Sequence, residues 1–278
     1  MEKDINKSDV IEAIAQDVYT DLAKPAATAA GEVIGLVPRA IKAALLPLEK
    51  WVVEREYNLA MTKKLLEEKL KSIPPEYIVQ PDAHVAVPAI QYISYCMDNE
   101  ELRNMYANLL ANSMNRVVKN GVHPGYVEII KQLSPDEAKI LKYMHTDSKI
   151  PTLGIKVMDG AKQIEITRDL TNVMKLAGCE ITGESRPYID NLVRLGLIEK
   201  SRYASFADKK VYEPLKNDPH TRSLEEFAKM WGEKKGYPTV KYEEGFIELT
   251  EYGRGFCFIC LTVPEMEHIE VGVKDVDK

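Results

Sequence analysis

The closely spaced cysteines Cys257 and Cys260 are the residues whose type and spacing most directly suggest chemistry. A Cys-x-x-Cys pair can contribute to a zinc site, but such a site needs further ligands at matching spacing. The other two cysteines are solitary, and the next histidine, His268, lies eight residues beyond Cys260. Because a buried free cysteine behaves as a small hydrophobic residue, we expect both thiols to pack in the core on one helix face. A metal or redox site is the alternative, and we expect no cofactor.

Arg116 and His123 form a second candidate pair, separated by six residues. This spacing is the outer limit of the arginine–histidine pattern of HEPN-type ribonucleases, helical proteins in which both side chains position and polarise an RNA phosphate. Asn120 and Gly121 lie between the two residues and Pro124 follows them, and these residue types interrupt helices. We therefore expect no continuous helix that presents both side chains. A ribonuclease toxin stays an alternative to a protein that is not an enzyme.

Composition sets the conditions under which any site must work. The chain has 278 residues, with 37 lysines and arginines against 43 aspartates and glutamates, a net charge of −6. An acidic protein has no global attraction for nucleic acid, so such binding would need a local basic patch. Four cysteines fit a reducing compartment, and the first ten residues lack the basic-then-apolar order of a signal peptide. We therefore predict a cytoplasmic protein.

The N-terminal part, residues 1–148, is predicted to be a multi-helix domain. Apolar residues recur at helical spacing in amphipathic helices over residues 25–75, and a second helical block covers residues 83–146. Within this block Ser134 and Glu137, with a proline between them, are typical of a helix that begins at a capping box.

The stretch from Pro25 to Leu48 combines small residues with an apolar stripe, and it contains Glu32, Arg39 and Lys42. No charge-free run within it reaches about 18 residues, so a membrane-spanning helix is not expected. It also lacks the dense basic face of a helix that lies on a membrane surface. We expect amphipathic helices that pack against their neighbours, with a membrane-acting effector as the alternative.

The remaining residues, 149–278, are predicted to form a winged-helix-like α+β domain. Apolar alternation on both sides of Asp159–Gly160 predicts a β-hairpin. Two short helices follow, a strand restarts after Gly196, and a last strand leads into the final helix. A long insertion at about 203–245 carries its own helix, for which Ser223 is the expected cap. The predicted fold class is mainly α, with this α+β domain at the C-terminus.

Basic residues of the second domain could form the local patch that nucleic-acid binding requires. Between residues 186 and 210 six basic residues stand against three acidic ones. Winged helices read nucleic acid but also mediate protein interaction and dimerisation, so the fold alone does not decide the function. A nucleic-acid-binding regulator is therefore a further alternative. Its candidate contacts are Arg186, Arg194, Lys200, Arg202, Lys209 and Lys210.

Several long motifs occur in a consistent order along the chain. They are GLVPRAIKAALLPLEKWVVEREYN, LLEEKLKSIPPE, VPAIQYISYCMDNEELRNMYANLLANSMN, HPGYVEIIKQLSPDEAKIL, YIDNLVRLGLIE and LTEYGRGF. This order resembles the Abi-alpha (abortive infection alpha) family of bacteria. The resemblance implies a role in defence against phage and supplies no catalytic residues. We therefore expect a sensor, scaffold or toxin that acts by protein interaction, in a homo-oligomer or with a partner protein such as a phage component.

Three amides recur every four residues in the DNEELRNMYANLLAN segment, opposite its apolar stripe. They are Asn104, Asn108 and Asn112. Amides on one helix face suit a contact with a partner, and these residues are the interaction candidates. A solvated helix face is the simpler interpretation.

Overall fold

The computed structural model describes residues 56–264, with gaps at 148, 181–184 and 202–203. The stretch 25–48, for which we expect packed amphipathic helices, lies outside the described residues. None of the helices within the described ranges has the length and apolar character needed to cross a membrane.

The chain divides into two compact units by its contacts. The first contains the described residues up to Gln132 together with those from Ile259 onward, and the second runs from Leu133 to Phe258. The boundary between a helical and a winged-helix-like domain near residue 149 stays a prediction.

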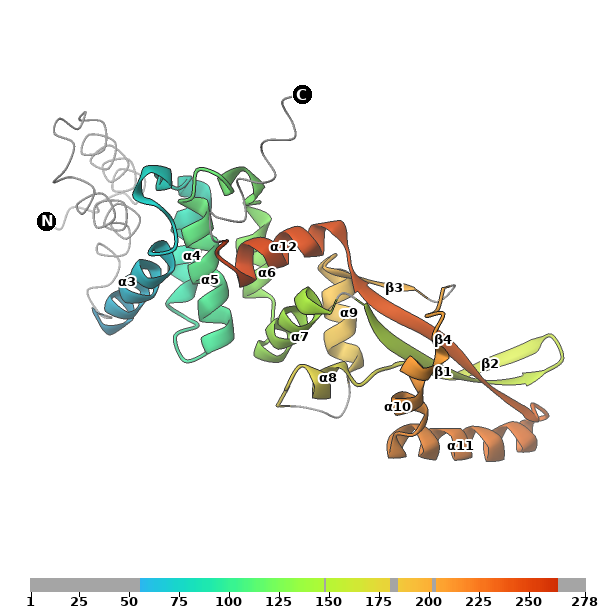
Figure 1. Ribbon diagram of the computed structural model, residues 1–278. Helices are drawn as coiled ribbons and strands as arrows, with labels where there is room; N and C mark the ends of the chain where they lie inside the picture. The colour runs from blue at the N-terminus through green and yellow to red at the C-terminus, as the bar shows by residue number, and fades with distance from the viewer. Residues whose placement is uncertain (1–55, 148, 181–184, 202–203, 265–278) are drawn as a thin grey trace, which may run out of the picture. The chain divides into compact units, whose positions relative to one another are not determined.

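The first unit is helical (Figure 1). Its helices are α3 (Glu56–Leu70), η1 (Pro75–Tyr77), α4 (Ala83–Ile93), α5 (Glu100–Ser113), η2 (Lys119–Gly121) and α6 (Gly125–Lys131). Helix α5 contacts α3, α4 and α6, and ten of its residues are buried. Asn99 caps this helix, because its side-chain oxygen accepts a hydrogen bond from the Leu102 amide at 2.9 Å. The core of this unit is therefore built around α5.

The second unit contains an antiparallel sheet with the strand order β2-β1-β4-β3. Its strands are β1 (Lys149–Asp159), β2 (Lys162–Leu170), β3 (Ile198–Ser201) and β4 (Thr239–Leu249). Its helices are α7 (Pro135–Thr146), α8 (Val173–Leu176), α9 (Arg186–Arg194), η3 (Lys209–Tyr212), α10 (Glu213–Lys216), α11 (Pro219–Lys235) and the start of α12 (Glu251–Leu261). The described residues are thus mainly helical with one four-stranded sheet, in agreement with the broad expectation.

Local signals in the sequence are confirmed in this unit. Ser134 and Glu137 form the expected capping box at the start of α7. The β1–β2 hairpin turns at Gly160, whose φ of +55° suits glycine, and Val157 pairs with Ile164 across the strands. Gly196 has a φ of +71° and ends α9 before β3.

Helix α11 covers one face of the sheet and begins earlier than expected. Its Ala228 packs with Ile155 and Val157 of β1 in a buried cluster. The predicted cap at Ser223 is wrong, because Asp218 caps the helix by accepting from the His220 amide at 2.9 Å. The aspartate, followed by a proline at the first helical position, is the stronger start signal.

Candidate functional site

The amides of α5 contact the end of α12 rather than solvent. Asn112 Nδ2 donates to the carbonyl oxygens of Ile259 at 2.7 Å and Thr262 at 2.8 Å. Asn108 Nδ2 donates to the carbonyl oxygen of Cys260 at 3.0 Å. Both asparagines are buried. The last carbonyls of a helix lack partners within the helix, so these side chains act as a cap supplied by another element.

This arrangement corrects the expectation of a solvated amide face. Asn108 and Asn112 are 3% and 0% exposed, and their donor groups are engaged by the chain itself. Asn104, which lies two helical turns before Asn112 on α5, is half-buried. A contact between Asn104 and a partner protein stays a prediction. The burial of the other two could not be read from spacing, because their partners lie 152 and 147 residues away along the chain.

The two closely spaced cysteines are fully buried on α12, as the packing interpretation requires. Burial raises the pKa of the Cys257 thiol to about 12. Because the thiolate is the form that attacks or binds metal, a thiol with this pKa is inert at neutral pH. Among the described residues, no group of three histidine, cysteine, aspartate or glutamate side chains could hold a metal ion.

Arg116 and His123 lie in the irregular segment after α5, which ends at Ser113. The Arg116 amide donates to the Tyr77 carbonyl at 2.8 Å, and its guanidinium carbon lies 5.3 Å from the centre of the Tyr77 ring. His123 Nδ1 accepts from the Gly125 amide at 3.0 Å. No continuous helix presents both side chains, as expected, and a ribonuclease role for this pair stays an alternative.

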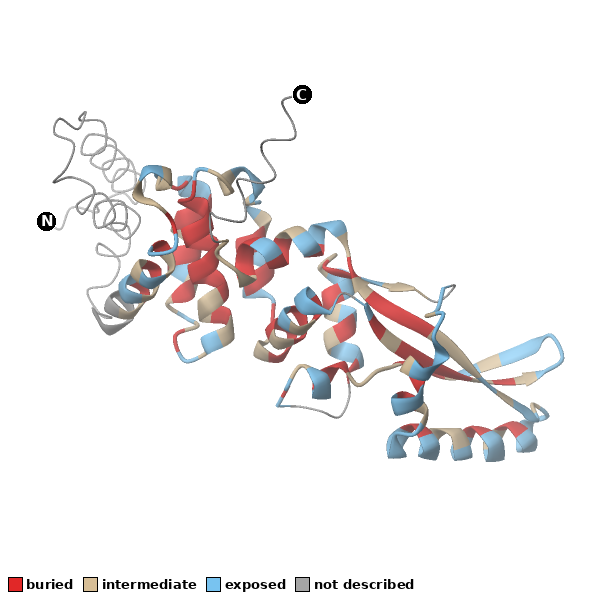
Figure 2. Cartoon of the chain, in the orientation of Figure 1, coloured by how far each residue is buried: buried red, intermediate tan, exposed pale blue. Residues whose placement is uncertain are grey.

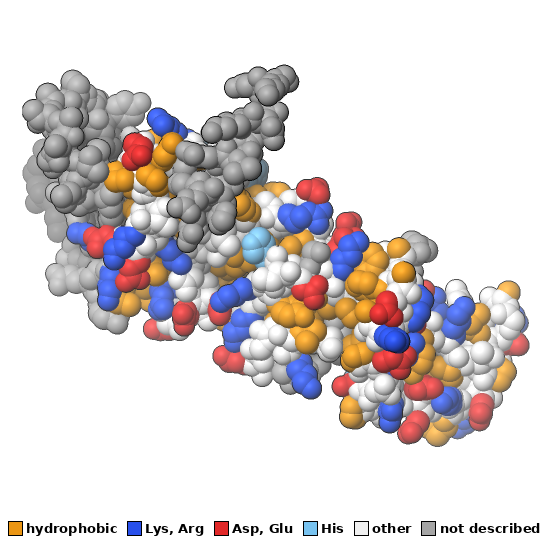
Figure 3. Space-filling view, viewed as in Figure 1, with side chains coloured by type: hydrophobic (Ala, Val, Ile, Leu, Met, Phe, Trp, Pro, Cys, Tyr) orange, Lys and Arg blue, Asp and Glu red, His pale blue; other side chains and the backbone are white. Residues whose placement is uncertain are grey.

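The predicted basic residues of the second unit have different surroundings. Arg186, Arg194 and Lys210 are exposed, while Arg202 lies outside the described residues. Lys200 Nζ pairs with Asp169 at 2.9 Å and with Asp190 at 2.6 Å. Lysine and arginine side chains alternate with acidic ones on the face of this unit seen in Figure 3. The excess of positive charge in the sequence is therefore partly neutralised in space.

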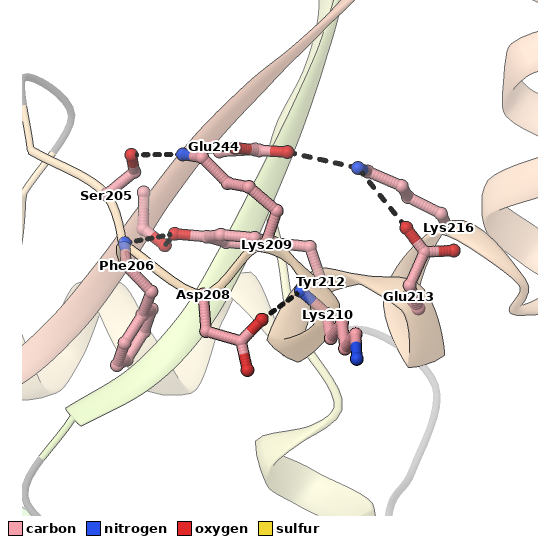
Figure 4. Close-up of polar contacts among 10 residues, drawn as sticks. Ser205, Phe206, Asp208, Lys209, Lys210, Tyr212, Glu213, Lys216 and Glu244 are labelled. Carbon is pink, nitrogen blue, oxygen red and sulfur yellow. Dashed lines mark hydrogen bonds and ion pairs between the residues drawn. The ribbon is translucent and has the colours of Figure 1, made fainter.

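Lys209 is likewise paired, within a network centred on Glu244 of β4 (Figure 4). The Glu244 carboxylate forms ion pairs with Lys209 Nζ at 2.8 Å and with Lys216 Nζ at 3.0 Å. The hydrogen bond from Lys209, and then that from Lys216, lowers the pKa of Glu244. The Tyr212 hydroxyl donates to the Gly245 carbonyl at 3.0 Å and accepts from the Phe206 amide at 3.0 Å. These contacts fasten the segment after β3 to β4.

The network was not anticipated from the sequence. Glu244 is half-buried in this network, and Asp169, which pairs with Lys200 outside it, is buried. Neither residue stands at a recognisable motif. Asp169 also has a φ of +56°, an uncommon conformation for a residue other than glycine. The adjacent Glu243 and Glu244 of β4 place carboxylates on opposite faces of the strand, since a strand presents alternate residues to opposite faces.

The fold and these contacts define a mainly helical protein with an antiparallel-sheet unit. The chain belongs to the abortive infection alpha (Abi-alpha) family, whose model matches residues 54–260. Membership implies a role in abortive infection, a defence against phage. No curated protein matches the chain. It is similar to the solved structure of an uncharacterized protein from the hydrocarbon-degrading marine bacterium Alcanivorax borkumensis SK2. The TM-score is 0.36 at 18% identity, over 49% of this chain and 92% of that one.

Proposed function

We propose that this protein acts in abortive infection by binding a protein partner in the cytoplasm, as a sensor, scaffold or toxin and without catalysis. The observation that carries the proposal is an exposed apolar pair on α11. Phe227 is 48% exposed and Met230 is 66% exposed. Residues three apart on a helix are neighbours on its surface, and aromatic residues and methionine are enriched at protein interfaces.

Helix α11 is held rigidly enough to present this pair. Its inner side packs on the sheet while its outer side is exposed (Figure 2). The Tyr242 hydroxyl of β4 donates to the Glu225 carboxylate at 2.7 Å, and Lys229 pairs with Glu225 at 2.7 Å. A preformed surface loses less conformational entropy when a partner binds. The insertion that carries α11 is thus suited to recognition.

The test compares two double variants in a phage-sensitive host. Phe227→Ser with Met230→Ser removes the apolar pair, and Glu226→Ser with Glu233→Ser changes exposed polar positions of the same helix. We expect the first variant to lose protection against phage while its circular dichroism spectrum stays that of the wild type, and the second to protect fully. Protection that survives the loss of both apolar side chains would overturn the proposal.

A nucleic-acid-binding regulator is the second candidate, because the element order supports a winged helix. In chain order α7 is followed by the β1–β2 hairpin and then by α8, α9 and β3, and β3 pairs with β4 beside β1 in the order β1-β4-β3. Arg186 and Arg194 are exposed on α9, which would be the recognition helix of such a fold. The ion pairs of Lys200 and Lys209 with acidic residues argue against a wide phosphate-binding surface.

The salt dependence of DNA binding tests this candidate. If α9 contacts phosphates, Arg186→Ala and Arg194→Ala should each reduce the slope of log affinity against log salt by about 1. Lys64→Ala, at an exposed position of α3 in the first unit, is the control and should leave the slope unchanged. A flat salt dependence in the wild type would exclude a phosphate-reading role.

A further inference from the structure

A pocket of about 280 Å³ opens in the first unit, between the end of α4, the start of α5 and the end of α6. Its walls include Leu102, Ile130 and the ring of Tyr106, all of which are buried core residues. The Tyr106 hydroxyl is directed to the Val127 carbonyl at 3.4 Å, so its polar group is engaged outside the pocket. The interior therefore offers apolar contact and few partners for water.

One charged group lines this pocket among the described residues, and it is a cation. Lys131 Nζ donates to the Tyr92 hydroxyl at 2.7 Å and lies 3.7 Å from Glu128 Oε2. The hydrogen bond with Tyr92 raises the pKa of Lys131, so the ammonium is charged at neutral pH. An ammonium has three donors. Tyr92 accepts from one of them, and Glu128 is an ion-pair neighbour at 3.7 Å, so a donor is available for a ligand. An apolar pocket with one cation at its rim is complementary to an apolar chain that ends in an anion.

We propose that this pocket binds a single-chain amphiphile with an anionic head group, namely a medium-chain fatty acid, with its carboxylate on Lys131 and its chain against Leu102, Ile130 and Tyr106. At about 30 Å³ for a water-sized group, the volume accommodates roughly nine such groups. The single alkyl chain of a medium-chain fatty acid therefore fits the pocket, whereas the two chains of a phospholipid exceed the volume of the pocket. This inference does not depend on the protein-binding surface of α11.

Cys96 supplies a reporter inside the pocket. It is half-buried and lines the cavity, whereas the other three cysteines are buried. The full-length protein is alkylated with N-ethylmaleimide with and without decanoate, and the rates of alkylation are compared. The decanoate concentration stays below the critical micelle concentration of decanoate. Loss of labelling in Cys96→Ser assigns the signal to this thiol. We expect saturating decanoate to slow the alkylation of Cys96 by at least about tenfold, because the chain would cover the sulfur.

The head-group assignment is tested with one variant and one uncharged ligand. Lys131→Met should weaken protection by decanoate about tenfold, the loss of one charge-assisted hydrogen bond. Lys64→Met, at an exposed position of α3, should leave it unchanged. Decanol should protect the wild type more weakly than decanoate and should not distinguish the two variants. Equal protection by decanol and decanoate would overturn the anionic ligand, and no protection by either would overturn the pocket's assignment.

Discussion

Replacing Asn112 by alanine tests whether the amides of α5 hold the end of α12. The substitution removes two hydrogen bonds, to Ile259 and Thr262. The Ile259 carbonyl is buried and would lose its partner at a cost of about 1–3 kcal/mol, while the part-buried Thr262 carbonyl would lose about 0.5–1.5 kcal/mol. The Asn112 side-chain carbonyl oxygen is buried and has no hydrogen-bond partner in the described residues. Its removal relieves a desolvation penalty and so offsets part of this loss of stability. We expect a net loss of about 2 kcal/mol.

The measurement should report on α12 itself, because the chain consists of two compact units and one global midpoint would average over both. Hydrogen exchange followed by mass spectrometry resolves the peptide that contains Ile259 to Thr262. A loss of about 2 kcal/mol corresponds to a roughly 30-fold faster exchange of amides that open locally. Circular dichroism confirms that the remaining helices are retained.

Asn104→Ala is the matched control for this experiment. Asn104 is the same residue type on the same helix, it is half-buried, and its effect should lie within about 0.5 kcal/mol. Asn112→Asp adds a stringent comparison, since a carboxylate has the shape of the amide but cannot donate to the Ile259 carbonyl. It should destabilise α12 more than alanine does at neutral pH. Equal exchange in Asn112→Ala and Asn104→Ala would refute the capping role.

Three further perturbations test other parts of the second unit, and a glycine of the first unit serves as a control. A Cβ at Gly253 would overlap the Leu197 carbonyl oxygen, so Gly253→Ala should lower the stability of the second unit by about 3 kcal/mol, measured by hydrogen exchange of the amides of that unit. Gly121→Ala, where a Cβ meets only ordinary contact at 3.9 Å, should change it little. Ser134→Ala removes the cap of α7 and should cost about 1 kcal/mol, measured in the same way. The lowered pKa of Glu244 stabilises the folded state above the unfolded pKa, and this stabilisation is lost as pH falls through the folded value. Denaturation at successive pH values should therefore show a shallower loss of stability between about pH 5 and pH 3 in Glu244→Gln than in the wild type.

Much of the local structure could be predicted because its causes lie within a few residues. The capping box at Ser134 satisfies backbone amides three positions away. Gly160 and Gly196 stand where the backbone needs a positive φ, which glycine adopts without steric cost. Where two local signals competed, as at the start of α11, the sequence contained the correct cap, Asp218. The aspartate–proline pair at Asp218 is a stronger start signal than Ser223.

The candidate sites depended on contacts that no local pattern encodes. Asn108 and Asn112 have the helical spacing of a solvated face, and they are buried because α12 returns to α5 about 150 residues later in the chain. Lys200 and Lys209 contribute to a positive stretch in the sequence, but Asp169 and Glu244 neutralise them from other strands. The sequence by itself determined the local elements, because periodicity, caps and turns act over one or two helical turns, and its long motifs in their order carried the resemblance to the family. Only the tertiary structure decided which polar side chains are free to meet a partner, because burial and charge pairing depend on distance in space.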